Sequence, residues 1–207
     1  RQMLDRALAL HADGYAVLLI DLPSHGESSG DRITFGFREA EGVRAGMRFL
    51  RDSARPGRIA VIGVSLGAAA LALSDVVPAP DAVVLESMYP TIVEAVSDRL
   101  RLRAGAAGAA VAPLLVRQIP WRLGIAVDQL RPIDHVARIG APLMIVAGTD
   151  DRRTTVEETR RIFERAASPK ELWLIEGAGH VDLYDFDPGT YQSRALAFVK
   201  RHLAIAG

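Results

Sequence analysis

Short runs of consecutive apolar residues alternate along this chain with segments in which apolar residues recur every three or four positions. Because the runs are apolar throughout, they predict strands of a parallel sheet that is covered on both faces. The spaced pattern predicts amphipathic helices between them. This alternation indicates an α/β fold with a doubly wound, mostly parallel sheet. The expected strands lie at 15–20, 58–62, 81–85, 142–147 and 171–175, and the expected helices at 1–11, 37–50, 66–73, 156–166 and 191–203.

One segment, 87–140, breaks this alternation. It is too long for an ordinary connection between a strand and a helix. Its four prolines, at positions 90, 113, 120 and 132, are expected to divide it into short helices. It also carries seven arginines against four acidic residues. We therefore expect a small helical cap at 87–140, inserted into a core made of 1–86 and 141–207.

Composition and charge exclude several classes of protein. The 207 residues are 49% hydrophobic, which suffices for a sizeable core and argues against disorder. Lys and Arg together number 25, as do Asp and Glu, so no net charge favours nucleic acid as a partner. The absence of cysteine excludes disulfides, zinc–thiolate sites and a cysteine nucleophile. The uncharged stretch 104–116 is too short to span a bilayer, and a cytoplasmic location is the default expectation.

The strongest chemical signal is the sequence Gly63-Val64-Ser65-Leu66-Gly67, placed directly between an expected strand and an expected helix. This G-x-S-x-G arrangement is typical of a nucleophile elbow, a sharp turn that projects the serine hydroxyl above the sheet. Small flanking residues are expected because a bulky side chain would collide with the neighbouring strand and helix. The following helix begins at Leu66, so its backbone N–H is expected to help stabilise an oxyanion.

A serine nucleophile requires a base, and His180 is the best candidate among five histidines. It ends the sequence Glu176-Gly-Ala-Gly-His180 directly after the last expected strand, in a loop able to carry an imidazole over the edge of the sheet. The other four are expected to have packing, surface or loop roles: His11, His25, His135 and His202.

The base in turn requires an orienting acid. Asp151 is the preferred candidate, because it follows the expected strand 142–147 at the position where the turn faces the site. Its neighbour Asp150 is expected to cap or brace the loop, and Glu86, after the third strand, is an outside candidate.

Taken together, these motifs resemble an α/β-hydrolase of the serine aminopeptidase-like and BEM46-like kind. The resemblance rests on the loop 21–28, on the elbow around Ser65, and on the sequences around Asp151 and His180, and it covers the chain from 15 onward. It implies the order serine, aspartate, histidine and a structural role for the loop of His25 and Gly26. Ser24 stands where this family usually has glycine.

The resemblance also implies a strand that this chain does not contain. Related proteins place a strand ending in His-Gly upstream, between the strands corresponding to 15–20 and 58–62, and the loop after it supplies the second oxyanion N–H. A sheet without this strand would lose its ladders there. We therefore expect an upstream portion before Arg1, and neither the compartment nor the oligomeric state follows from the sequence.

The implied reaction is acyl transfer from a small carboxylic ester to water, without a metal or an organic cofactor. Met88, Tyr89 and Trp121 are expected to line the substrate pocket. The apolar stretch 104–116 is a further candidate for the pocket lining, but packing of the cap on the sheet is the preferred explanation for it. A thioesterase or an aminopeptidase-like amidase would use the same three residues. A non-catalytic binding protein with this fold is the remaining alternative.

Overall fold

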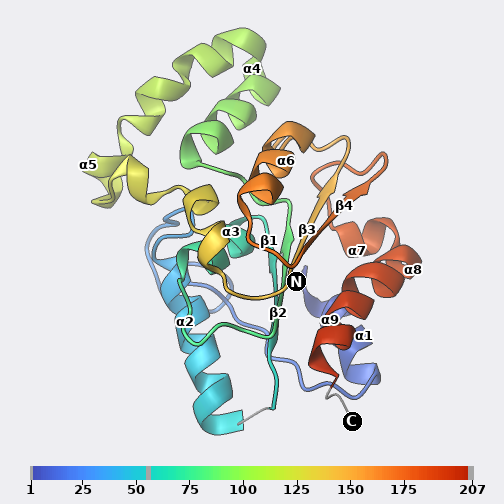
Figure 1. Cartoon of the computed structure of the whole chain (residues 1–207). Coiled ribbons are helices and arrows are strands. Elements are labelled where there is room, and N and C mark those ends of the chain that lie inside the picture. Colours follow the sequence, from blue (N-terminus) through green and yellow to red (C-terminus); the bar gives the residue numbers. More distant parts are fainter. Residues whose placement is uncertain (1, 55–56, 205–207) are drawn as a thin grey trace.

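The computed structural model describes residues 2–54 and 57–204 and contains a parallel sheet of four strands (Figure 1). Neighbouring strands follow one another in chain order, β1-β2-β3-β4. All pairs are parallel, with Val64 opposite Glu86 and Glu86 opposite Val146 at the carboxyl ends. The strands are β1 (Ala60–Val64), β2 (Ala82–Glu86), β3 (Leu143–Gly148) and β4 (Lys170–Ile175). The expected α/β fold with a parallel sheet is thus confirmed.

Helices cover both faces of the sheet. Alternate residues of a strand point to opposite faces, so Val83 and Leu85 of β2 join one apolar cluster and Val84 joins the other. The first face is covered by α2 (Glu39–Phe49), α3 (Leu66–Leu73) and α6 (Val156–Arg165). The second face is covered by α1 (Leu4–Ala12), α7 (Leu183–Phe186), α8 (Pro188–Tyr191) and α9 (Ala197–Leu203).

The helix α3 lies against the sheet through small side chains. Ala68, Ala69 and Ala70 are completely buried, and α3 contacts β1, β2 and α2. Methyl side chains let this helix approach the strands closely, which fixes the turn that precedes it. Because that turn holds Ser65, the packing of α3 bears directly on the site.

The prediction of a strand at 15–20 is wrong. The segment has no regular secondary structure and joins no ladder, and its apolar side chains are more than a third exposed at Val17, Leu18, Leu19 and Ile20. In the part of the chain that the structure describes, β1 pairs with β2 alone. An apolar run becomes a strand only where a neighbour accepts its backbone hydrogen bonds, and 15–20 has none in this structure. The segment instead lines an open groove along α2, beside Gly46 and Phe49.

The segment 87–140 is helical, as expected, and α4 (Ile92–Val116) and α5 (Ile119–Leu123) form an arm that projects from the sheet (Figure 1). Short 3-10 turns at Val127–Gln129, Pro132–Asp134 and Val136–Arg138 lead back to β3. The expectation that Pro113 ends a helix is wrong, since Pro113 lies inside α4. The break falls at Ala104 and Gly105 instead, where Gly105 takes a φ of 59°, a value that glycine adopts readily.

Candidate functional site

Ser65 occupies a strained turn between β1 and α3. Its φ and ψ are 49° and −108°, a conformation that residues with a side chain rarely adopt. Its backbone N–H donates to the carbonyl oxygen of Glu86 at 2.8 Å, which ties the turn to the end of β2. A Cβ atom on Gly63 would lie 2.8 Å from the Cα of Ala68, so glycine is required there. This geometry is that of the expected nucleophile elbow.

The second glycine of the motif has a different explanation. The position of a Cβ on Gly67 has no atom within 4 Å in the described structure, so the expected collision at this residue is wrong. The reason is that Gly67 lies on the open side of the first turn of α3. Leu66 begins this helix. Its N–H is one of the first four of the helix, which have no acceptor within the helix.

His180 lies between the serine and the aspartate that the sequence singles out. Its Nε2 is 3.3 Å from the Oγ of Ser65, and its Nδ1 is 2.8 Å from the Oδ2 of Asp151. The loop that carries the imidazole packs on the end of β3, where a Cβ on Gly148 would lie 2.0 Å from the carbonyl oxygen of Ala178. The three side chains come from the ends of β1, β3 and β4, and they form one continuous hydrogen-bonded series.

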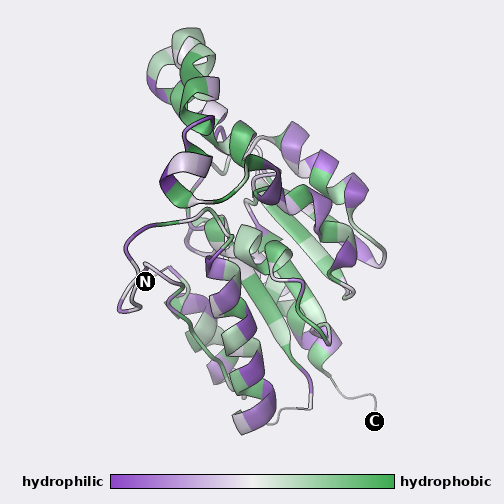
Figure 2. Ribbon diagram, turned by 90° about the vertical axis from the view of Figure 1, so that its left-hand side faces the viewer, coloured by the Kyte–Doolittle hydropathy of each residue, from purple (hydrophilic) through white to green (hydrophobic). Residues whose placement is uncertain are grey.

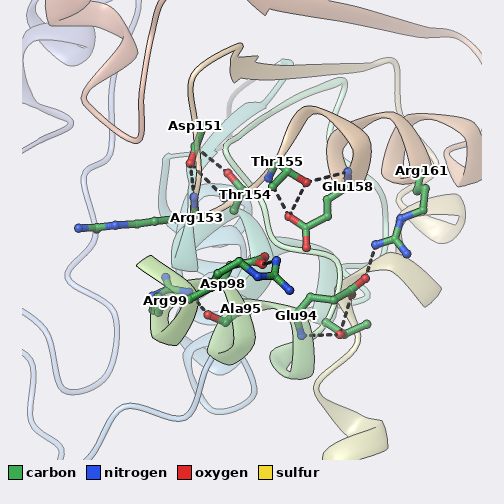
Figure 3. Close-up of polar contacts among 12 residues, drawn as sticks. Glu94, Ala95, Asp98, Arg99, Asp151, Arg153, Thr154, Thr155, Glu158 and Arg161 are labelled. Carbon is green, nitrogen blue, oxygen red and sulfur yellow. Dashed lines mark hydrogen bonds and ion pairs between the residues drawn. The ribbon is translucent and has the colours of Figure 1, made fainter. Parts of the chain in front are cut away.

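The carboxylate of Asp151 is buried and fully hydrogen-bonded (Figure 3). Its Oδ1 accepts the backbone N–H groups of Arg153 and Thr154 at 2.8 and 3.0 Å. Its Oδ2 accepts the hydroxyl of Thr154 at 2.7 Å, in addition to the bond with His180. Burial by itself would raise the pKa of Asp151, but the bonds from His180 and Thr154 outweigh burial and lower it. The acid is therefore held as a carboxylate that faces the imidazole.

The neighbouring aspartate does not take part in this series. The backbone N–H of Asp150 donates to the carbonyl oxygen of Ala178 at 2.9 Å, and its side chain is exposed. The backbone of Asp150 thus braces the loop, and Asp151 rather than Asp150 contacts His180 in this structure.

The expectation that Glu86 could serve as an alternative orienting acid is corrected by the structure. Its carboxylate is completely buried, and it is bound by the guanidinium of Arg6 and the hydroxyl of Tyr191 rather than by His180. The Nη2 of Arg6 lies 2.8 Å from the Oε2 of Glu86. Arg6 is itself 1% exposed, and its Nη1 is 2.7 Å from the Oδ1 of Asp182, two residues after His180. The sequence carries no local signal for this cluster, because its members are far apart along the chain.

A second buried polar cluster lies behind Asp151, between α4 and α6 (Figure 3). Thr155 and Glu158 form a reciprocal cap at the start of α6, and the carboxyl of Glu158 also interacts with that of Asp98 on α4. The Oδ2 of Asp98 is buried and has no hydrogen-bond partner among the described residues. Burial and the neighbouring Asp98 raise the pKa of Glu158 to about 7 against the opposing bond from Thr155. Like-charged carboxyls this close favour sharing of one proton.

The loop 21–28 is built around its own hydrogen bonds. The Nδ1 of His25 is 2.9 Å from the carbonyl oxygen of Pro23, and the hydroxyl of Ser28 donates to the carbonyl oxygen of Asp21 at 2.7 Å. Ser24 has a φ of 63°, in the left-handed region that glycine adopts more readily than serine. The interactions of His25 agree with the structural role expected for it.

The structure places the three residues expected to line a substrate pocket in two different environments. Met88 and Tyr89 are each 3% exposed and lie in the core cluster, where the hydroxyl of Tyr89 donates to the carbonyl oxygen of Phe35 at 2.9 Å. Trp121 lies on the arm and is 88% exposed. The structure therefore does not bring the three together around Ser65, because the arm turns its tryptophan outward. Among residues 2–54 and 57–204, no group of three or more His, Asp or Glu side chains is arranged to hold a metal ion.

Comparison with known proteins identifies a matching family and several relatives of this chain. The model of the alpha/beta hydrolase family matches residues 2–191. An uncharacterized protein of Mycobacterium tuberculosis is 32% identical over 178 residues, which are 85% of this chain and 57% of that protein. The protein YqkD of Bacillus subtilis is 24% identical over 190 residues, 90% of this chain and 62% of its own length. The chain thus spans less than two thirds of these relatives.

A solved structure gives the same picture of the fold. The structure of the esterase Pf2001 from Pyrococcus furiosus aligns with a TM-score of 0.78 at 25% sequence identity, covering 99% of this chain and 75% of that one. The alignment includes the strands and helices that carry Ser65, Asp151 and His180.

Proposed function

Because this chain belongs to the α/β-hydrolase family and joins Ser65, His180 and Asp151 in one hydrogen-bonded series, we propose that it is a serine hydrolase that cleaves carboxylic esters. The observation that carries the proposal is the imidazole of His180, which touches the serine hydroxyl with one nitrogen and the buried carboxylate with the other. In this proposal, 1–86 and 141–207 form the catalytic core and 87–140 forms a helical cap.

The reaction follows from the roles that the geometry allows. The Nε2 of His180 removes the proton from Ser65 as its Oγ attacks the ester carbonyl, and a tetrahedral oxyanion forms. When the carbon–oxygen bond to the alcohol breaks, the imidazolium returns that proton to the leaving alkoxide. Water, deprotonated by the same nitrogen, then attacks the acyl-serine and releases the carboxylic acid. Asp151 holds the Nδ1–H tautomer and stabilises the imidazolium in both halves.

The oxyanion is expected to accept the backbone N–H of Leu66, at the start of α3. A preorganised donor of this kind lowers the barrier by roughly 3 kcal/mol. The strained φ of Ser65 supports this role, because it projects the hydroxyl away from the strand while the helix begins at the next residue.

An ester is the proposed substrate class on two grounds. The matched Pyrococcus protein is named an esterase. In addition, the buried carboxylates near the site, Asp151 and Glu86, are both occupied by partners on this chain, which leaves neither free to bind a substrate amine. The same residues would attack a thioester, so rates on matched esters and thioesters have to be compared to distinguish the two substrate classes.

Labelling with a fluorophosphonate probe tests the nucleophile directly. The wild-type chain is expected to form a covalent adduct on Ser65, detected by intact-mass spectrometry and peptide mapping, and Ser65→Ala is expected to form none. The neighbouring hydroxyl variant Ser87→Ala is a matched control that should label like wild type. Absence of labelling in wild-type protein with a folded circular-dichroism spectrum would favour a non-catalytic binding protein.

The substrate class is tested separately with acyl esters of graded chain length, aminoacyl amides and acyl thioesters. Preference for esters, expressed as the ratio of kcat/KM values, is the expected result. A higher kcat/KM for the matched thioester would replace the esterase proposal with a thioesterase, while leaving the three residues in the same roles.

A further inference from the structure

The second half of α4 is apolar on every side, yet only one side of it is buried. Residues 104–116 contain no charged side chain. Gly108, Ala112 and Val116, spaced four residues apart, form a buried face. The opposite face is exposed and equally apolar, and it includes Val111 and Leu114, the latter 64% exposed. A water-facing helix surface normally carries polar side chains, so this face has the composition of a surface that is covered.

The fold of the arm explains why this face points outward. The break at Ala104 and Gly105 turns the chain so that the two halves of α4 pack on each other. A Cβ on Gly108 would lie 2.1 Å from the carbonyl oxygen of Leu100, which shows how closely they approach. Contact within the arm therefore occupies the buried face. The arm projects beyond the sheet (Figure 1), and hydrophobic colouring covers much of its ribbon in Figure 2.

The charged side chains along the arm are predominantly positive. Residues 99–127 contain five arginines and no acidic residue, although the whole chain carries 25 basic and 25 acidic side chains. Arg101 pairs with Asp98 at 3.0 Å, just outside that range. The ion pairs of the described residues include none with Arg103, Arg117 or Arg122. Two of these arginines directly flank the uncharged stretch. A local excess of positive charge is complementary to anionic lipid headgroups.

Trp121 adds a third observation. It lies on α5, beyond the end of α4, and it is 88% exposed, whereas the only other tryptophan, Trp173, is 4% exposed in the core. Exposed tryptophan is costly in water but favourable at the boundary between headgroups and acyl chains. Leucine, arginine and tryptophan thus occur together on one projecting arm.

We propose that the arm formed by α4 and α5 binds to the surface of a bilayer that contains anionic lipids, with Leu114 and Trp121 in the interfacial region and the arginines among the headgroups. The helical residues after the break, 106–116, extend about 16 Å, less than the roughly 30 Å of a hydrocarbon core, so the arm lies on the membrane rather than crossing it. None of the helices that the structure describes could serve as a transmembrane span. The proposal is independent of catalysis.

Vesicle binding tests this inference. The full chain is mixed with vesicles of phosphatidylcholine containing 30% phosphatidylglycerol or with vesicles of phosphatidylcholine alone, and bound protein is measured by sedimentation. Binding to the anionic vesicles is expected, with weaker binding at high salt. Because Trp173 is buried, a blue shift of tryptophan fluorescence and its quenching by brominated lipid report on Trp121, and Trp121→Phe should abolish both signals.

Matched variants make the test specific to the arm. Leu114→Glu should lower the vesicle partition coefficient about tenfold or more, since it places a charge where an apolar side chain enters the interface. Leu8→Glu is the control, because Leu8 is a leucine on α1 that is 55% exposed and far from the arm in the fold (Figure 1). Arg103→Gln combined with Arg117→Gln should remove the preference for anionic vesicles.

Three results would overturn the proposal. The first is an absence of wild-type binding to anionic vesicles. The second is equal loss of binding in Leu114→Glu and Leu8→Glu. The third is a concentration-dependent dimer in light scattering that Leu114→Glu disrupts, without vesicle binding, which would assign the face to a second copy of this chain. Ser65→Ala should bind vesicles like wild type, so a failure of the proposed hydrolase activity leaves this test unaffected.

Discussion

The buried Arg6 and the partly exposed Asp182 form an ion pair, 2.7 Å between Nη1 and Oδ1, that connects α1 to the loop of the candidate base. The same guanidinium binds Glu86, whose backbone carbonyl accepts the N–H of Ser65. The side chain of Asp182 also caps α7 by accepting the N–H of Tyr184 at 3.0 Å. One cation therefore braces both the turn of Ser65 and the loop that follows His180.

The first prediction concerns this brace. Asp182→Asn retains an acceptor for the N–H of Tyr184 but loses the ionic contact with Arg6, so kcat should fall about tenfold through misplacement of His180 while KM changes little. Steady-state kinetics on the preferred ester measures both constants. The exposed Asp185→Asn is the control. An unchanged kcat in Asp182→Asn would mean that other contacts hold the loop.

Arg6→Gln has a larger expected effect on folding. It leaves the completely buried carboxylate of Glu86 without its cation, and breaking a buried pair in this way costs about 3–5 kcal/mol of unfolding free energy. Chemical denaturation at neutral pH measures the loss. Arg6→Lys should recover part of it, because lysine restores the charge but cannot bind Glu86 and Asp182 with the same planar geometry. A variant Arg6→Gln as stable as wild type would show that the charge is dispensable.

The second prediction separates the two adjacent aspartates. Asp151→Asn should reduce kcat by about 10³–10⁴-fold, because an asparagine amide favours the wrong imidazole tautomer. Asp150→Asn should stay within about twofold of wild type, since the interaction of Asp150 with the loop is made by its backbone. Comparable losses in both variants would contradict the assignment of Asp151 as the partner of His180.

The third prediction uses the two glycines of the elbow. Gly63→Ala brings a Cβ to 2.8 Å from the backbone of α3 and should destabilise the fold by about 1–3 kcal/mol. Gly67→Ala meets no atom within 4 Å and removes a glycine from a helix, so it should stabilise the fold by about 0.5–1 kcal/mol. Urea unfolding of both variants decides the matter, and equal effects would refute the steric interpretation.

The fourth prediction concerns pH. Folding raises the pKa of Glu158 from its ordinary 4.5 to about 7, so the folded protein binds a proton more tightly than the unfolded chain. The resulting stability is present in full below pH 4.5 and is lost as the pH rises toward 7, by at most about 3 kcal/mol. Folding lowers the pKa of Asp151 instead, so the change in stability that this residue causes occurs at a lower pH.

Glu158→Gln should flatten this dependence, since glutamine keeps the bond from the N–H of Thr155 but does not titrate. Unfolding free energies at pH 5, 6, 7 and 8 measure the slope. Glu157→Gln, an exposed neighbour on the same helix, should retain the wild-type slope. If wild type and Glu158→Gln depend on pH identically, Asp98 and Glu158 do not share a proton in the folded protein.

The local pattern of apolar and polar residues was sufficient to predict much of the fold. Four of the five apolar runs form strands within two residues of their expected bounds, because each meets a parallel neighbour. The elbow was predictable as well, since a serine between two glycines, after a strand and before a helix, restricts the backbone locally. The run at 15–20 shows the limit, because forming a strand depends on a partner that a sequence pattern does not reveal.

By itself, the sequence determined the order of elements, the elbow at Ser65 and the small set of histidines and acids from which a site could be built. These are properties of neighbouring residues and follow from periodicity and turn geometry. The tertiary structure decided which groups meet: Asp151 with His180, Glu86 with Arg6, and Asp98 with Glu158. It also turned Trp121 outward on the arm. The physical reason is that burial, charge pairing and shared protons depend on contacts between distant segments, which exist only once the chain has packed.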